Sequence, residues 1–398
     1  MRNLRGENTI REAESLAGPS ERDRLGVLHV GKFYPPHMGG IETHLEALCG
    51  GLKKSVDLRV VVANDGSAST VEHLDGVPVS RLATVATVAS TPLCPQLIGE
   101  IRGSRADILH IHLPNPMAVM AYLASGYSGP VVFTYHSDTI RQKVLGPLFA
   151  PFLHQALRRS SAIIATSPDY VRSSVVLQRY TDRCHVVPFG IALDRFGERD
   201  ASAVEKLRRQ YGERIVMSAG RLVYYKGFDY LIRAMAQVDG TLLIVGSGPL
   251  RDDLGQLVRS LNLEGRVVFL GQIPDDELIA CYHAADVFAL ASCARSEAFG
   301  IVQIEAMAAG LPVVNTSLDS GVPFVSIHEE TGLTVPPADP EALAQAINLL
   351  LDNPELRRSL GDRARERARR EFSLDVMTSR TLALYESVVQ SSRGKSRA

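Results

Sequence analysis

The chain is poor in cysteine and contains no tryptophan. Its five cysteines are odd in number and widely separated, and no two of them form a Cys-x-x-Cys pair. These spacings argue against both a disulfide framework and a zinc finger. Because disulfides are rare in reducing compartments, the pattern favours a cytoplasmic location.

The sequence also lacks an excess of charge of either sign and any long apolar run. Lys+Arg 43 against Asp+Glu 44 gives a formal net charge of -1, so we expect no nucleic-acid partner. A membrane span needs about 20 consecutive apolar residues. The longest candidate, residues 301–314, is interrupted by Gln303 and Glu305. Residues 1–24 are polar and lack the apolar core of a secretory signal, so we expect a flexible leader there.

What the chain does contain is a regular alternation of short apolar runs and longer amphipathic stretches, which is typical of parallel α/β structure. The pattern runs through the first half and restarts at Ile215. Because the runs are nearly all apolar, we expect strands covered on both faces. The expected strands are residues 26–30, 58–63, 108–112, 130–135, 162–166, 215–219, 241–245, 267–270, 287–291 and 311–315.

The restart predicts an α/β protein with two Rossmann-like, doubly wound domains that face each other across a cleft. Domains of roughly 100–200 residues suit this length. We place a leader at 1–24, an N-terminal domain at 25–195 and a C-terminal domain at 196–375. Residues 376–398 form a C-terminal helix, able to pack back on the N-terminal domain, and a tail that frays from Ser391. Ligands of such sheets bind beyond the carboxyl ends of the strands, so the strand-to-helix loops are candidate sites.

Two of these loops are rich in glycine. Gly39 and Gly40 stand just before an expected helix, where the backbone can approach an anion closely. The alternative is a turn that needs a positive φ. Gly246-Ser247-Gly248-Pro249 resembles the start of a dinucleotide fingerprint, but position 251 is Arg where the third glycine would stand. We therefore give it little weight as a nicotinamide site.

Arg221 and Lys226 follow the first strand of the second half. Two cations that converge at this point can neutralise a diphosphate, Arg through its planar fork and Lys as a point charge. The segment is not a Walker A motif. The alternative is a pair of solvated surface cations.

The segment 296–306 carries two carboxylates, Glu297 and Glu305, with Gly300 between them. If helical, the pair would be separated by roughly 12 Å, so it could touch the two ends of an extended ligand. The backbone N–H groups of residues 299–301 would open toward a phosphate. Glu305 lies in an otherwise apolar helix, where a charge needs a partner or a ligand. The alternative is an ordinary helix with one exposed glutamate.

His136 follows an apolar strand, where it can hydrogen-bond a sugar hydroxyl or a phosphate, although a lone histidine is more often structural. His110 and His112 share one face of a strand, as two metal ligands would, but no third ligand is evident nearby. The chain has no Asp-x-Asp motif, which argues against a divalent-metal diphosphate clamp of that kind. We expect no metal.

Taken together and in order, these segments resemble the retaining glycosyltransferase family 4, which has the GT-B architecture. The resemblance covers about residues 25 to 390. The ordered set is specific, whereas no single member is. Its members are the Gly39-Gly40 loop, Tyr135-His136-Ser137-Asp138, Pro188-Phe189-Gly190-Ile191, Gly220-Arg221 with Lys226-Gly227, the Glu297 and Glu305 pair, and residues 331–336.

The resemblance implies a nucleotide-sugar donor, an acceptor-side N-terminal domain and a nucleotide-sugar-binding C-terminal domain. Catalysis would involve Glu297, His136, Arg221 and Lys226, without a metal or other cofactor. The resemblance implies that Arg221 and Lys226 bind the diphosphate and stabilise the leaving group, and that Gly39 and Gly40 approach the phosphates. Glu297 would contact the transferred sugar, Glu305 the ribose, and Ile273 would lie near the base. Backbone contacts would come from Phe299, Gly300 and Ile301. His136 would lie beside the sugar and the acceptor.

Residues 225–228 and 318–323 look most like bacterial mannosyl- and rhamnosyltransferases of polysaccharide or O-antigen assembly. This likeness implies transfer of a hexose, best mannose from GDP-mannose, with retention onto a saccharide or lipid-linked saccharide. A UDP-sugar enzyme of the same family, transferring glucose, galactose or GlcNAc, is the alternative. Alternatives of other classes are a nicotinamide-dependent oxidoreductase and a non-catalytic nucleotide-sugar-binding protein.

The stretch 141–159 could lie on anionic lipid, which would place the protein peripherally at the inner face of the membrane. The alternative is a core-facing helix with cationic flanks. The stretch carries the cations Arg141, Lys143, Arg158 and Arg159 around Val144, Leu145, Leu148, Phe149 and Phe152.

Overall fold

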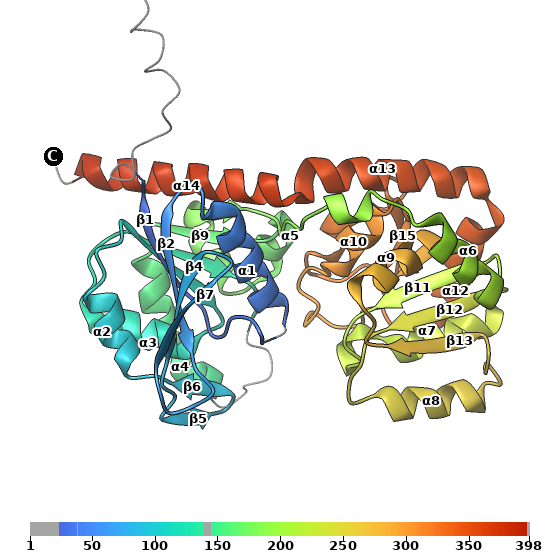
Figure 1. Cartoon of the computed structure of the whole chain (residues 1–398), viewed down its shortest axis with the longest axis horizontal. Helices are drawn as coiled ribbons and strands as arrows, with labels where there is room; N and C mark the ends of the chain where they lie inside the picture. The colour runs from blue at the N-terminus through green and yellow to red at the C-terminus, as the bar shows by residue number, and fades with distance from the viewer. Residues whose placement is uncertain (1–23, 38, 139–144, 396–398) are drawn as a thin grey trace, which may run out of the picture.

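Figure 1 shows the computed structural model as two α/β units side by side, with the C-terminal helices running along both. The structure describes residues 24–37, 39–138 and 145–395. The leader expected at 1–24 lies outside this range except for Arg24, and so do residues 139–144, which include the cations Arg141 and Lys143. None of the described helices is long and apolar enough to cross a membrane.

The first unit is built on an eight-stranded sheet with the order β10-β9-β8-β7-β1-β2-β4-β3. Its neighbours are parallel, except that β3 pairs antiparallel with β4 at one edge. The strands of this unit, including the separate ribbon β5-β6, are β1 (Gly26–Val30), β2 (Asp57–Ala63), β3 (Thr70–Leu74), β4 (Val77–Leu82), β5 (Ala86–Val88), β6 (Thr91–Leu93), β7 (Ile108–Leu113), β8 (Val131–Tyr135), β9 (Ala162–Ala165) and β10 (Cys184–Val186). Its helices are α1 (Gly40–Leu52), α2 (Gln96–Arg102), α3 (Pro116–Ser125), α4 (Leu145–Arg158) and α5 (Pro168–Ser173).

The second unit is built on a six-stranded sheet with the order β13-β12-β11-β14-β15-β16, parallel throughout. Its strands are β11 (Ile215–Ala219), β12 (Thr241–Val245), β13 (Val267–Gly271), β14 (Val287–Ala289), β15 (Val313–Thr316) and β16 (Gly332–Val335). The remaining helices are α6 (Ala201–Tyr211), α7 (Phe228–Ala234), α8 (Arg251–Ser260), α9 (Asp275–Ala284), α10 (Val302–Ala308), α11 (Val322–Val325), α12 (Pro340–Asp352), α13 (Pro354–Phe372) and α14 (Leu374–Lys395).

Every apolar run that we expected to be a strand overlaps one, with bounds that differ by up to two residues. The strands missing from the expectation are β3 to β6, β10 and β16. Two of them, β3 and β5, are largely exposed and carry no apolar run, and β10 is only three residues long. Short or exposed strands leave little hydrophobic signal in a sequence.

The chain passes between the two units twice, at adjacent places. The N–H of Ile191 donates to the carbonyl of Phe372 at 3.0 Å, and the N–H of Leu374 donates to the carbonyl of Ile191 at 2.9 Å. Gly190 permits this approach, because a Cβ there would collide with the carbonyl oxygen of Ser373. The two crossings therefore form one joint.

Beyond this joint, α14 begins at Leu374 and packs along α1 of the first unit (Figure 1). The helix begins two residues before the boundary that we placed at 376. It remains helical to Lys395, so the frayed tail that we expected from Ser391 is wrong for residues 391–395. The i to i+4 hydrogen bonds of a helix that is supported by packing extend into this polar end.

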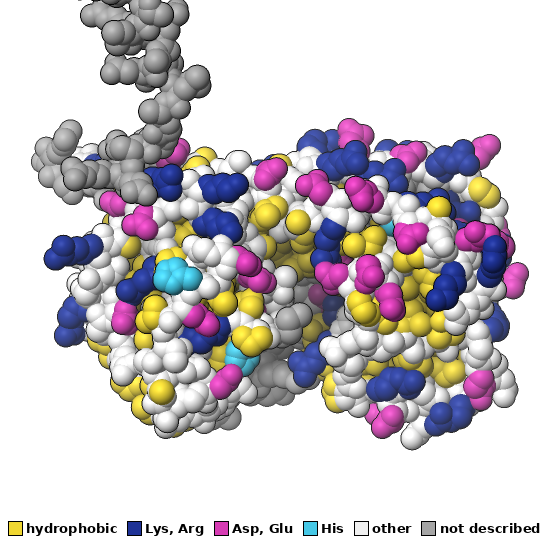
Figure 2. Space-filling model, viewed as in Figure 1, with side chains coloured by type: hydrophobic (Ala, Val, Ile, Leu, Met, Phe, Trp, Pro, Cys, Tyr) yellow, Lys and Arg dark blue, Asp and Glu magenta, His cyan; other side chains and the backbone are white. Residues whose placement is uncertain are grey.

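The two faces of the first sheet differ in character. One face is apolar and packs under α2, α3 and α4. The other packs under α1 and α14, and it buries His29, His110 and His112 among aliphatic side chains. On the outer surface seen in Figure 2, Lys and Arg side chains are interspersed with Asp and Glu.

Candidate active site

A cleft of about 890 Å³ lies between the two units, at the carboxyl ends of their strands. Segments that directly follow β8, β11, β12 and β13 line it, as expected for doubly wound sheets. The structure brings together most of the predicted site residues in this cleft. Those that line it are Gly39, Gly40, His136, Arg221, Lys226, Glu297, Phe299, Gly300 and Ile301.

The wall formed by the second unit is charged. Lys226 Nζ lies 2.5 Å from Glu297 Oε2, and both side chains are largely buried. Ser292 Oγ donates to the same carboxylate oxygen at 3.0 Å. Arg221 follows β11 and is exposed to the cleft. Two cations and one carboxylate therefore give this wall a net positive charge.

Glu297 lies in a loop, because α10 begins only at Val302. The separation considered for a fully helical segment between Glu297 and Glu305 therefore does not apply. Gly300 adopts a φ of 76°, which favours glycine, and a Cβ there would come within 2.8 Å of Gln303 Nε2. The chain turns at Gly300, so the backbone of residues 299–301 lies along the cleft.

The paired glycines of the first unit line the cleft, but they do not form the turn with positive φ that we considered as the alternative. Gly39 is extended, with a φ of -178°, and Gly40 is the first residue of α1. Neither position requires a left-handed backbone. A Cβ at Gly40 would have nothing within 4 Å, so the space beside it is open to a ligand. Gly246, by contrast, is needed because a Cβ there would strike the carbonyl oxygen of Gly220.

Two predicted donor-binding residues do not line the cleft. Glu305 accepts a hydrogen bond from the Tyr282 hydroxyl at 2.7 Å, and burial raises the pKa of its carboxyl although this hydrogen bond opposes the shift. Ile273 lines a separate pocket beside α6 and α9, whereas its neighbour Gln272 lines the cleft. The contacts of Glu305 and Ile273 with ribose and base stay predictions.

The wall formed by the first unit is built from histidines. His136 lies one residue beyond β8, is only 3% exposed and packs against the rings of Phe189 and His44. Burial lowers the pKa of His136 to about 3. Its Nε2 lies 3.1 Å from His112 Nδ1, while its own Nδ1 has no hydrogen-bond partner among the residues that the structure describes.

A third histidine, which the sequence did not reveal, lies beside His110 and His112. His29 pairs with His110 in the register of β1 and β7, and its Nδ1 lies 3.1 Å from His112 Nε2. His29, His110 and His112 could together surround a cation, as could His44, His112 and His136. The expectation that no third ligand lies nearby is thus wrong. However, the facing nitrogens of His29 and His112 already share a hydrogen bond, which a metal would have to displace.

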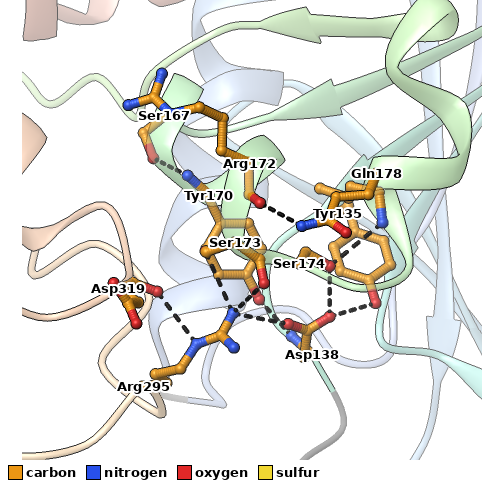
Figure 3. Close-up of polar contacts among 11 residues, drawn as sticks. Tyr135, Asp138, Ser167, Tyr170, Arg172, Ser173, Ser174, Gln178, Arg295 and Asp319 are labelled. Carbon is orange, nitrogen blue, oxygen red and sulfur yellow. Dashed lines mark hydrogen bonds and ion pairs between the residues drawn. The ribbon is translucent and has the colours of Figure 1, made fainter.

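A set of polar contacts around Arg295, which we call the latch, joins the two units beside the cleft (Figure 3). Arg295, two residues before Glu297, donates from Nη2 to the carbonyl of Ser173 at 3.0 Å and lies 3.5 Å from Asp138 Oδ2. Its Nε donates to the carbonyl of Asp319 in its own unit at 3.1 Å. Asp138 lies two residues after His136. The latch therefore connects the loops that carry His136 and Glu297.

The Asp138 carboxylate is held from its own unit as well. Its Oδ1 accepts from the Tyr135 hydroxyl at 2.9 Å and from Ser174 Oγ at 2.8 Å (Figure 3). Burial, together with the negative charge of Asp138, raises the pKa of the Tyr135 hydroxyl. Asp138 is thus held by hydrogen bonds within its own unit as well as by Arg295.

Asp138, Ser292 and Arg295 belong to this site but were not among its predicted residues. Asp138 stands in the segment Tyr135-His136-Ser137-Asp138 that was chosen for His136, and Arg295 stands one residue before the segment 296–306. Their signal was proximity in sequence to residues already chosen. No pattern indicated that the two segments would meet.

Comparison with known proteins agrees with this two-unit architecture. Residues 38–195 match the family described as Glycosyltransferase Family 4, and residues 201–367 match Glycosyl transferases group 1. The chain is 32% identical over 353 residues to the D-rhamnosyltransferase WbpZ of Pseudomonas aeruginosa, covering 88% of this chain and 92% of that protein. It is 29% identical over 371 residues to the O-antigen chain mannosyltransferase C of Escherichia coli, covering 92% and 100%.

Among solved structures, sucrose-phosphate synthase from Thermosynechococcus elongatus superimposes with a TM-score of 0.78 at 27% identity, covering 92% of this chain and 100% of that one. The match extends over both units and the cleft between them. The oxidoreductase alternative is set aside, because the full-length matches are to sugar-transferring enzymes. The chain belongs to glycosyltransferase family 4 and is a transferase of the GT-B architecture.

Proposed function

We propose that this enzyme transfers a mannosyl residue from GDP-mannose, with retention, onto a saccharide or lipid-linked saccharide acceptor, in bacterial polysaccharide or O-antigen assembly. The observation that carries the nucleotide-sugar part is the positive wall of Arg221 and Lys226 beside Glu297. The sugar is supported by the rhamnosyl- and mannosyltransferases that the chain resembles over most of its length.

The chemistry follows from where charge develops. When the bond between the sugar and the diphosphate breaks, negative charge grows on the leaving phosphate. Lys226 is held by Glu297, and Arg221 lines the same wall, so both can stabilise this charge. Preorganised charge stabilisation is usually the largest single contribution to catalysis. This scheme needs no metal. The leaving phosphate can itself accept the proton of the acceptor hydroxyl.

Glu297 would orient the transferred sugar. Lys226 and Ser292 both contact its Oε2. The other oxygen, Oε1, can then accept a hydrogen bond from a sugar hydroxyl. A carboxylate so held loses little conformational entropy when it binds, which favours a single orientation of the sugar.

The donor is tested with a thermal-shift panel of GDP-mannose, UDP-glucose, UDP-GlcNAc, ADP-glucose and dTDP-rhamnose. We expect GDP-mannose alone to raise the unfolding midpoint strongly, because only a ligand that binds the folded state stabilises it. Transfer from the α-linked donor is then followed by NMR of the product, which should carry an α-linked mannose. A selective shift with a UDP-sugar would replace this donor by the alternative, and a β-linked product would contradict retention.

A lipid-linked acceptor would require the enzyme to reach a membrane, and α4 offers a surface for it. On this helix Leu148 is 75% exposed and Phe152 is 41% exposed, while Phe149 packs toward the core. Apolar side chains beside the cations Arg158 and Arg159 suit anionic lipid. We expect Leu148→Ser with Phe152→Ser to reduce sedimentation with phosphatidylglycerol vesicles while transfer to a soluble acceptor persists. Equal sedimentation of both proteins would remove α4 from the proposal.

A further inference from the structure

Beneath the cleft, a continuous row of buried side chains leads away from His136, and the proposed chemistry does not use it. His136 Nε2 lies 3.1 Å from His112 Nδ1, and His112 Nε2 lies 3.1 Å from His29 Nδ1. The Tyr385 hydroxyl lies 3.4 Å from His29 Nε2 and 2.5 Å from His110 Nδ1. His110 Nε2 lies 2.7 Å from Thr134 Oγ1. We call these six residues the histidine row.

The fold explains why residues so distant in sequence meet here. His110 and His112 alternate with apolar residues on β7, so both point to the face under α1 and α14. The parallel register sets His29 beside His110 and Thr134 beside His112. Tyr385 enters from α14, and all members of the row are at most 3% exposed. Water therefore does not compete for their hydrogen bonds.

Each bond of the histidine row shares one proton, and two patterns remain when the Tyr385 hydroxyl donates to one neighbouring ring and accepts from the other. A Tyr385 oxygen that accepted from both rings would leave its own buried proton without an acceptor in the row, which is costly. Burial lowers the pKa of His29, His110, His112 and His136, so each ring is neutral and carries its proton on one nitrogen only. If one ring donates toward His136, all of them must do so; if one ring donates away from it, all must donate away. The proton of His136 is then on Nδ1 in the first pattern and on Nε2 in the second.

The two ends of the row decide between these patterns. In the first, the Thr134 hydroxyl donates to His110, and the single unmatched group is Nδ1–H of His136. In the second, the Thr134 proton would have no acceptor among its described hydrogen bonds, and His136 Nδ1 would be a bare lone pair. A buried polar group without a partner is costly, so the pattern with one such group is favoured over the pattern with two.

We propose that Thr134, His110, Tyr385, His29 and His112 are positioning residues that hold His136 in the tautomer protonated on Nδ1, so that this nitrogen donates a hydrogen bond to an oxygen of the sugar or acceptor. Because Nε2 is occupied by His112, Nδ1 is the nitrogen left for a ligand. The tautomer itself is independent of the proposed function, and only the identity of the oxygen rests on it. The row ends at a buried hydroxyl, so it sets a tautomer and does not carry a proton through the domain.

The tautomer can be read directly from the wild-type protein. Ring-nitrogen shifts of ¹⁵N-histidine-labelled enzyme at pH 7.5, from long-range ¹H–¹⁵N correlation, distinguish a protonated Nδ1 from a protonated Nε2. His136 is assigned by the resonance lost in His136→Gln. We expect protonated Nδ1 on His136, His112, His29 and His110. A protonated Nε2 on His136, or an imidazolium, would overturn the proposal, and so would stoichiometric zinc in the purified protein.

The far end of the row supplies the matched variants. Thr134→Val keeps the shape but removes the hydroxyl, whereas Thr134→Ser keeps the hydroxyl and removes the methyl group. We expect only Thr134→Val to shift His136 toward a mixture of tautomers and to lower kcat about tenfold, the size of one hydrogen bond, with the donor KM unchanged. Equal effects of both variants would indicate packing alone and overturn the proposal.

Tyr385→Phe interrupts the row at its middle and should behave like Thr134→Val. Its control is Tyr180→Phe, because the Tyr180 hydroxyl also forms a hydrogen bond with a histidine, at 2.8 Å from His154 Nδ1. This pair lies on other elements than the histidine row. The control should leave kcat and the His136 shifts unchanged. Unchanged shifts in Tyr385→Phe would contradict the row even if kcat fell. Altered shifts with wild-type kcat would keep the row and remove His136 from the reaction.

Discussion

The two walls of the cleft occupy equivalent places, beyond the carboxyl ends of parallel strands. One wall is charged, whereas the other is neutral. The wall of the C-terminal domain carries full charges on Arg221, Lys226 and Glu297. The wall of the N-terminal domain presents His136, which burial keeps neutral at pH 7, above further neutral histidines. Under the proposed function, the charged wall would face the leaving diphosphate, and the neutral wall would face the reacting hydroxyl groups.

The difference shows how one fold, used twice, divides the work of a site. Fixed charges stabilise a developing charge without reorganisation. A neutral ring instead offers one donor or one acceptor, and its direction depends on its neighbours. The neutral wall should therefore be sensitive to protonation, and the charged wall to the loss of a single charge.

Acid should produce the largest effect, and it should act on the N-terminal wall. The pKa values of His29, His44, His110, His112 and His136 are all lowered from the usual 6.5 by burial, to about 3 for His29 and His136. The unfolded chain binds these protons near pH 6.5 and the folded chain does not. The free energy of unfolding should therefore fall as the pH falls below 6.5, by about 1.4 kcal/mol per pH unit for each histidine.

Urea unfolding at pH 7.5, 6.5 and 5.5 measures this slope. His29→Gln should reduce the steepness by about one proton. His73→Gln, at an exposed position on β3, should leave it unchanged. A free energy of unfolding that stays level from pH 7.5 to 5.5 would show that the histidine wall is not neutral and buried.

Breaking the buried ion pair should produce the next largest effect, on the charged wall. Lys226→Ala leaves Glu297 as an uncompensated carboxylate that is only 7% exposed. Removing one partner of a buried pair costs about 3–5 kcal/mol, so this variant should lose stability as well as activity. Adding Glu297→Gln should restore most of the stability and none of the activity. If Lys226→Ala unfolds at the wild-type denaturant midpoint, the pair is not effectively buried.

Arg221→Ala should separate activity from stability. Arg221 is exposed, so its removal should leave the unfolding midpoint nearly unchanged. Turnover should fall by about 10²–10³, as it does when one preorganised donor to a developing charge is lost. Arg221→Lys should recover part of this loss, since a point charge without the planar fork remains. Near-normal turnover by Arg221→Ala would remove it from the diphosphate site.

The latch between the walls should give the smallest effect. Arg295→Met removes the contacts with Ser173 and Asp138, and partly exposed ion pairs contribute only about 0–1 kcal/mol. We expect a modest loss of kcat/KM, about fivefold, which is about 1 kcal/mol. Arg295→Lys should lose less. Wild-type kcat/KM for Arg295→Met at low and high salt would show that the latch does not hold the two catalytic loops together.

The sequence predicted the parallel strands, the two domains and most of the cleft lining, because buried parallel strands are continuous apolar runs and their loops follow directly. It did not predict the histidine row. His110 and Tyr385 are 275 residues apart, and His29 and Tyr385 are 356 apart. Only sheet register and the return of α14 bring them together, and neither is written in a local pattern.

The charged wall was better predicted than the neutral one for a physical reason. Arg221, Lys226 and Glu297 stand in loops beside glycines, where a charged residue is a visible exception. Asp138 and Arg295 were missed because each belongs to a different domain, so no spacing relates them.

The joint at Ile191 and Ser373 also has a consequence for the order in which the molecule is assembled. Because α14 returns to pack on α1, the C-terminal domain is an insertion within the N-terminal one. During synthesis, the whole second domain must be translated before Tyr385 can reach His29 and His110 in the first sheet. Domains generally fold as units as the chain emerges, so the domain translated second can finish folding first. Until then the histidines of β1 and β7 lack the hydroxyl that joins them.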